Sequence, residues 1–228
     1  MKSRSLHKLL GLTAFIFLIN ASVTGVLRAN AKGLYWKDRP PQKDNAVLAS
    51  PAFGLDQVFK YYQEHFPGNS IKKVQLKTFL GKTVYQLETS QPDQKYLLLD
   101  AQSGSLISPV SEQTASQVAR LVAGDAELKL TESVEAYKAR KSSEPRPAFH
   151  FVFKDDVGTE IYVDQATGET LQVLDKGRRF ALWVNRLHEL DFADQGRVWL
   201  TVIGFLFIFL SFTGLSLALS FKKAAVGR

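Results

Sequence analysis

Cysteine is absent from the 228 residues of this chain. The chain therefore has no disulfide, no thiolate metal site, no iron–sulfur cluster and no cysteine nucleophile. It also lacks the glycine-rich phosphate loop, the His-Glu-x-x-His zinc motif and the Gly-x-Ser-x-Gly motif of hydrolases. These absences argue against a self-contained enzyme and leave the question of activity open.

Acidic residues are missing from both ends of the chain. The chain has 29 Lys and Arg residues and 22 Asp and Glu residues, which gives a net charge of +7. Residues 1–8 and residues 221–228 each carry three basic residues and no acidic one, so the two tails hold most of the excess. The remainder is nearly neutral, which argues against a nucleic-acid partner.

Two long runs without any charged residue lie next to these basic tails. Residues 9–27 form one run of 19, and residues 198–221 form another of 24. Because about 20 apolar residues cross a hydrocarbon core of ~30 Å, we predict transmembrane helices at 9–27 and 198–220. Lys and Arg concentrate on the cytoplasmic side of such helices. The tails are therefore predicted to be cytoplasmic, and the middle of the chain lies across the membrane from them.

A competing interpretation concerns the first apolar run. Ala29-Asn30-Ala31 has the small-x-small form of a signal-peptidase site, and cleavage there would leave one carboxy-terminal anchor. Against cleavage, the apolar run exceeds the usual ~7–15 residues of a signal peptide, and Arg28 immediately precedes the motif. In both interpretations the middle of the chain leaves the cytoplasm.

The middle of the chain contains two similar units, residues 50–110 and 111–176. They align at an offset of 64 residues, which matches Asp100-x-x-x-Gly104 with Asp164-x-x-x-Gly168. In each unit an amphipathic helix precedes strands of alternating polarity. In the two turns, Asp accepts backbone N–H bonds and Gly supplies a positive φ. The sequence therefore predicts an α+β fold of two tandem units, each a helix packed on an antiparallel sheet.

Several motifs resemble a known family. Tyr-Val-Asp-x-x-Thr-Gly at 162–168 resembles the PepSY domain. His-Glu-Leu-Asp-Phe at 188–192, before a helix with Thr213-Gly214, resembles the PepSY-associated transmembrane family, and His7 followed by Thr24-Gly25 is similar to that family's first helix. The resemblance implies a bacterial inner-membrane protein with PepSY-like units in the periplasm. Among relatives are propeptide-like peptidase modulators and multi-span proteins tied to haem, ferric-siderophore reduction or flavin-based electron transfer.

The four histidines are the candidates for metal or proton chemistry. His65 ends a predicted helix, where a cation suits the carbonyl end of the dipole. His150 matches Gln86 in the other unit, so we expect it on an open, solvated face. The resemblance implies haem ligation by His7 or His188, but the predicted topology places them on opposite sides of the membrane. Since a bis-His haem needs two imidazoles on one iron, a dimer or a partner would supply the second ligand.

Residues 178–196 are predicted to form an amphipathic helix at the membrane surface. Its apolar stripe consists of Phe180, Trp183, Leu187 and Leu190. His188 and Asp191 are three residues apart, so they can meet on one face away from the lipid. We therefore predict Trp183, His188 and Asp191 as partner- or ligand-binding residues; the alternative is a purely structural anchor.

Asn20 is the one strongly polar side chain of the first predicted span. A buried amide prefers a hydrogen-bond partner, for which Ser211, Thr213 or a second copy of the chain are the predicted candidates. The alternative is a lone Asn tolerated in the outer part of the bilayer.

The function predicted on the resemblance is that of a non-catalytic accessory or binding subunit in iron uptake or transmembrane electron transfer. The two alternatives are a peptidase-modulating membrane protein and a haem-carrying redox component of a ferric-reductase-like system. The expected partners are the lipid bilayer, a periplasmic or membrane protein and a second copy of the chain. No cofactor other than haem is indicated.

Overall fold

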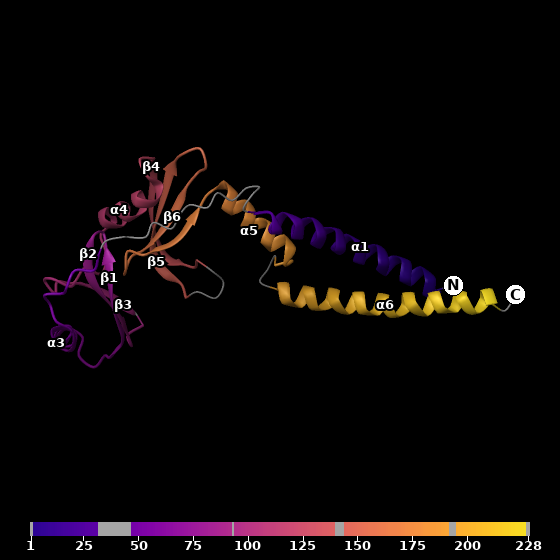
Figure 1. The fold of residues 1–228 in the computed structure, drawn as a ribbon, viewed down its shortest axis with the longest axis horizontal. Helices are drawn as coiled ribbons and strands as arrows, with labels where there is room; N and C mark the ends of the chain where they lie inside the picture. Colours follow the sequence, from indigo (N-terminus) through magenta and orange to yellow (C-terminus); the bar gives the residue numbers. More distant parts are fainter. Residues whose placement is uncertain (1, 32–46, 93, 140–143, 192–194, 227–228) are drawn as a thin grey trace. The chain divides into compact units, whose positions relative to one another are not determined.

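The computed structural model describes residues 2–31, 47–92, 94–139, 144–191 and 195–226. The chain forms two compact units: a membrane unit of Met1–Asp38 with Gly177–Arg228, and an α+β unit of Arg39–Lys176. Figure 1 shows their elements coloured along the sequence.

The membrane unit is built from α1 (Lys2–Ala29), α5 (Lys176–His188) and α6 (Gly196–Val226). Helices α1 and α6 pack against each other, and both chain ends lie at the same end of this pair (Figure 1). The segments His7–Ala29 and Gly196–Ser216 are long and apolar enough to cross a membrane. Most of their large apolar side chains are exposed, as expected for helices whose solvent is lipid. The two helices fit a two-span membrane protein that associates with the bilayer.

Helix α5 is shorter than the predicted range of 178–196, because the chain turns sharply after His188. Leu190 adopts a left-handed φ of 52°, and the Asp191 N–H donates to the Arg186 carbonyl at 2.9 Å. Gly196 then begins α6 in close contact with this turn. A Cβ at Gly196 would lie 2.8 Å from the Glu189 carbonyl oxygen, so only glycine fits there without movement of the backbone.

The first half of the α+β unit contains α3 (Leu55–His65), β1 (Ile71–Phe79), β2 (Lys82–Thr89) and β3 (Tyr96–Asp100). The strands form an antiparallel sheet in the order β1-β2-β3. Helix α3 buries Val58 and Tyr62 against one face of this sheet, where they meet Tyr85, Leu87, Leu97 and Leu99.

The second half contains α4 (Glu112–Ala123), β4 (Glu127–Tyr137), β5 (Arg146–Lys154), β6 (Glu160–Asp164) and β7 (Thr170–Leu174). These strands form an antiparallel sheet in the order β4-β5-β6-β7. Helix α4 starts where Ser111 accepts the Thr114 N–H at 3.1 Å and ends at Gly124, which has a φ of 68°. The prediction of an α+β fold with two antiparallel sheets is confirmed.

One core joins the two halves. Phe151, Ile161 and Ala119 pack together between α4 and the second sheet. Val84 of β2 and Leu98 of β3 belong to the same buried cluster. The first sheet therefore packs one face against α3 and the other face against the second half of the unit.

The two Asp-x-x-Ser/Thr-Gly turns have the predicted local structure. Gly104 and Gly168 adopt positive φ values of 73° and 66°. Asp100 Oδ1 accepts two backbone N–H bonds at 2.8 and 3.0 Å, and the bond from Ser103 is the main reason that the pKa of Asp100 falls below its usual value. Asp164 Oδ1 accepts the backbone N–H and the hydroxyl of Thr167 at 2.7 and 3.0 Å. Each turn thus closes on an aspartate whose Oδ1 accepts two hydrogen bonds from the turn.

Candidate functional site

Each histidine of the membrane unit is hydrogen-bonded to a threonine on another helix. His7 Nδ1 lies 2.8 Å from Thr213 Oγ1, and His188 Nδ1 lies 2.8 Å from Thr24 Oγ1. Each imidazole also contacts the glycine that follows its threonine, with Cε1 3.6 Å from the position of a Cβ on Gly214 or Gly25. The membrane unit therefore contains the same type of contact twice. His7 of α1 contacts the Thr213-Gly214 pair of α6, and His188 of α5 contacts the Thr24-Gly25 pair of α1.

Each threonine hydroxyl that contacts an imidazole also lies within hydrogen-bond distance of a backbone carbonyl of its own helix. Thr24 Oγ1 donates to the Asn20 carbonyl at 2.5 Å, and Thr213 Oγ1 donates to the Phe209 carbonyl at 3.0 Å. A hydroxyl has a single proton, so once it donates to a carbonyl it can only accept from the imidazole. With that hydroxyl orientation, a neutral imidazole carries its hydrogen on Nδ1 and keeps a lone pair on Nε2; a hydroxyl that donates to Nδ1 fits the same distances and gives the other tautomer. In the first orientation both side chains present an Nε2 that can bind a metal or a proton.

The two Nε2 atoms belong to opposite ends of the helix pair. Thr24, which binds His188, follows His7 by 17 residues on the same helix. At a rise of 1.5 Å per residue this separates the two contacts by about 25 Å. One chain therefore supplies one imidazole at each end, and the residues described contain no cluster of three or more His, Asp or Glu side chains that could hold a metal ion.

The three predicted site residues of the α5 region face different neighbours. His188 binds Thr24 of α1, whereas Asp191 Oδ1 accepts the Gly196 N–H at the start of α6, 3.3 Å away. Trp183 is 54% exposed and stacks on Phe180, with 5.9 Å between ring centroids. The helix instead buries Ala181 and Val184.

Two further contacts hold the end of α5 against α1. The Asn20 amide donates to the Leu187 carbonyl at 3.0 Å, and Arg28 forms an ion pair with Glu189 at 3.3 Å. The predicted partners of Asn20, Ser211 and Thr213, were wrong: the amide binds a carbonyl in the last turn of α5, and both hydroxyls donate to carbonyls of their own helix.

The other two histidines have structural surroundings. His65 Nδ1 donates to the Tyr61 carbonyl at 2.9 Å, and the two rings stack. The expectation of an open, solvated His150 was wrong. Its side chain is only 13% exposed, because it stacks on Tyr162 and lies 3.5 Å from the carboxylates of Glu132 and Glu160.

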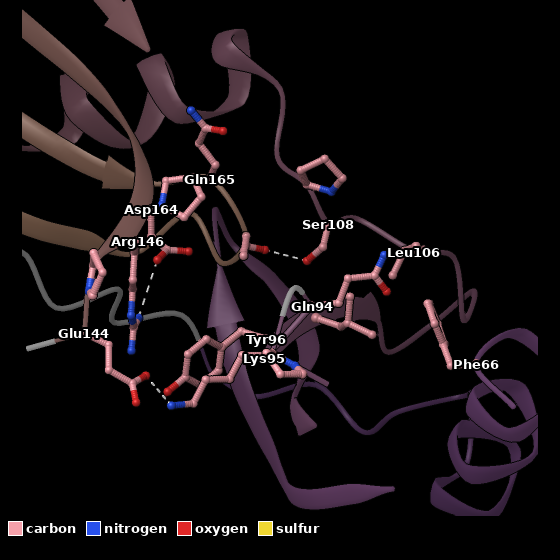
Figure 2. A pocket seen from close by; sticks show the side chains of 16 residues that line it. Phe66, Gln94, Lys95, Tyr96, Leu106, Ser108, Glu144, Arg146, Asp164 and Gln165 are labelled. Carbon is pink, nitrogen blue, oxygen red and sulfur yellow. Dashed lines mark hydrogen bonds and ion pairs between the residues drawn. The ribbon is translucent and has the colours of Figure 1, made fainter. Parts of the chain in front are cut away.

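The α+β unit contains a cavity of about 510 Å³ that the sequence analysis missed. Figure 2 shows Phe66 and Leu106 on one side of it and Glu144, Arg146 and Asp164 on the other. The cavity lies between residues next to β3 and the first residues of β5, so its walls come from both halves of the unit.

The charged side of this cavity is ordered by a buried carboxylate. Asp164 is 1% exposed; its Oδ1 is occupied by Thr167, and its Oδ2 lies 3.5 Å from Arg146 Nη1. The Arg146 guanidinium also lies over the Tyr96 ring, 4.4 Å from its centroid. Beside it, Lys95 forms an ion pair with Glu144, and their hydrogen bond raises the pKa of Lys95 and lowers the pKa of Glu144.

One signal in the sequence could have indicated the Arg146–Asp164 pair. At the 64-residue offset Arg146 matches Lys82, just as Asp164 matches Asp100. Lys82 contributes to the lowered pKa of Asp100 by its positive charge. A basic residue near each turn aspartate is therefore common to both halves.

Comparison with known proteins gives one match. The family model described as the PepSY-associated TM region matches residues 4–228, which include every helix and strand of both units except the first residues of α1. No curated protein and no solved structure matches the chain.

Proposed function

The chain belongs to the PepSY-associated transmembrane family, and from this premise we propose that it is a non-catalytic accessory subunit of a bacterial inner-membrane system for iron uptake or electron transfer. In this proposal the α+β unit consists of two PepSY-like halves on the periplasmic side. The basic tails and the position of both chain ends at one end of the helix pair support this orientation.

The observation that carries the proposal is the pair of imidazoles that contact a threonine hydroxyl through Nδ1. In this proposal Nδ1 donates to Thr24 or Thr213, so that Nε2 is the ligand atom, an arrangement typical of histidines whose other nitrogen binds a metal. Because each end of the helix pair offers one such atom, a complete two-imidazole site requires a second chain. This requirement favours a subunit that works in an assembly, with a partner protein or a second copy.

A haem-carrying redox component is the second candidate function, and the same atoms favour it. His7 and His188 would each hold a haem iron through Nε2, and the second imidazole would come from another chain. A bound haem would supply one-electron transfer. The peptidase-modulating alternative makes a different prediction, namely a protease that co-purifies with the α+β unit.

We further propose that the end of α5 is the docking surface for the partner. Trp183 presents an exposed aromatic ring, and His188 and Asp191 lie at the turn that leads into α6. An aromatic ring at the membrane interface also serves as an anchor. The two roles separate by mutation, because an anchor depends on Trp183 and docking through a ligand atom depends on His188.

Loss of either imidazole should remove the partner or the haem. We expect full-length protein in mild detergent to lose its co-purifying subunit or its haem absorbance band in His7→Ala and in His188→Ala. The variant Thr24→Val removes the hydroxyl that contacts His188 Nδ1. It should lower the affinity of His188 for a metal group about 10- to 100-fold. Absorption spectra and mass spectrometry of purified samples provide the measurement.

His65→Ala is the matched control, since His65 binds only local groups of α3, and it should change neither signal. Trp183→Ala should loosen the attachment of α5 to the membrane without removing a haem signal. Unchanged spectra and unchanged partners in both His7→Ala and His188→Ala would restrict these residues to helix packing and refute the proposal.

The orientation in the membrane has its own test. We expect a reporter fused after Arg228 to be cytoplasmic and one inserted at Ser142, which lies outside the described residues, to be periplasmic. The reason is that basic residues resist translocation, and each terminal tail carries three basic residues and no acidic one. Paired reporters, one active in each compartment, measure this. Sequencing of the mature amino terminus is the companion experiment, and a start at Lys32 would show that only one span remains.

A further inference from the structure

The cavity of the α+β unit is divided into an apolar side and a cationic side. Phe66 and Leu106 line the apolar side, and Lys95 and Arg146 line the other (Figure 2). At about 510 Å³ the cavity has the size of a site for a small organic molecule or a short peptide segment. A few polar groups beside an apolar wall favour a ligand that has a polar group at one end and an apolar part at the other.

Arg146 is positioned to bind an anion. Its contact with Asp164 involves a single nitrogen, Nη1, and a guanidinium carries five N–H donors. The Tyr96 ring below the guanidinium and the buried Asp164 beside it hold the group in one orientation. Such an ordered, planar set of donors is suited to a carboxylate, which it can bind through two parallel hydrogen bonds.

Lys95 already binds a carboxylate from the chain itself. Its Nζ contacts Glu144 Oε2, and the Glu144 side chain is 66% exposed. Exposed ion pairs of this type contribute little to stability, so an incoming carboxylate can replace Glu144 at small cost. Glu144 therefore occupies the place of a ligand and competes with it.

We propose that this cavity binds carboxylates attached to an apolar body. The carboxylate takes the place of Glu144 at Lys95 and contacts Arg146, while the apolar body lies against Phe66 and Leu106. Both a free organic acid and the carboxyl terminus of a peptide have this chemistry. The site is independent of His7 and His188, so its failure and the failure of the accessory-subunit proposal are distinguishable.

The test measures dissociation constants by calorimetry on the full-length chain in lipid nanodiscs. One probe is 3-phenylpropanoate and the other is the peptide N-acetyl-Ala-Leu-Phe with a free carboxyl terminus. The corresponding amides are the matched neutral probes. We expect at least one acid to bind and its amide to bind about tenfold more weakly, because the charged hydrogen bonds are lost. Binding of one acid alone identifies the source of the carboxylate.

Variants of the cationic side complete the experiment. Lys95→Gln and Arg146→Gln should each weaken binding of the acid about tenfold, whereas Glu144→Gln should strengthen it by removing the competitor. Lys95→Gln keeps the test valid if Arg146→Gln, which leaves Asp164 buried without its partner, fails to fold. Lys154→Gln, at an exposed site outside the cavity, should bind like the wild type. Equal affinities for acid and amide, no binding of either acid, or no response to Lys95→Gln and Glu144→Gln would overturn the proposal.

Discussion

Gly168→Val should destabilise the α+β unit by about 2–6 kcal/mol, the combined cost of backbone strain and of overpacking. Gly168 has a φ of 66°, a conformation that a β-branched residue rarely adopts. In addition, a Cβ at this position would lie 2.4 Å from the Phe79 ring. Because Phe79 ends β1 and Gly168 follows β6, the collision pushes the two sheets apart. The free energy of unfolding of the full-length chain, measured by pulse proteolysis in urea, tests this prediction.

The variant Gly68→Val separates the cost of backbone strain from the cost of overpacking. Gly68 has a φ of 83°, but a Cβ there would have no atom within 4 Å outside its immediate neighbours. Only the strain, about 1–3 kcal/mol, should therefore remain. Gly104→Val should resemble Gly168→Val, because its Cβ would lie 2.5 Å from the Phe53 ring. If Gly168→Val costs no more than Gly68→Val, the close packing of Phe79 on this turn is incorrect.

Phe151→Ala should lower the free energy of unfolding by about 3–5 kcal/mol. Phe151 is fully buried in the core that α4 shares with both sheets, so its removal leaves a cavity in that core. Since Val84 and Leu98 of the first sheet belong to this core, both halves should lose stability together, in one transition. Urea titration of the full-length chain, followed by proteolysis and by circular dichroism, provides the measurement.

Phe59→Ala removes the same atoms from the exposed face of α3. Phe59 is 42% exposed, so its loss should cost much less than that of Phe151. Similar losses for Phe59→Ala and Phe151→Ala would mean that the core lies elsewhere. Separate transitions for the two sheets would contradict a shared core.

The sequence by itself determined the features that depend on residues close together in the chain. The length of a charge-free run decides whether a helix can cross a bilayer, and both predicted spans lie within long helices of the structure. Polarity that repeats every two residues predicted strands such as β5, and an Asp-x-x-Ser/Thr-Gly sequence predicted turns with positive φ at Gly104 and Gly168. Each of these follows from local geometry.

Only the tertiary structure decided which distant groups meet. The contacts of His7 with Thr213 and of His188 with Thr24 join residues 206 and 164 positions apart, and Asn20 reaches a carbonyl 167 positions away. The cavity likewise combines Lys95 with Arg146, and the stack on Tyr162 buries a histidine that alternation alone places in solvent. Periodicity specifies which face of an element is polar. Which partner that face meets depends on how helices and sheets pack, and packing is set by the shapes of side chains from the whole chain.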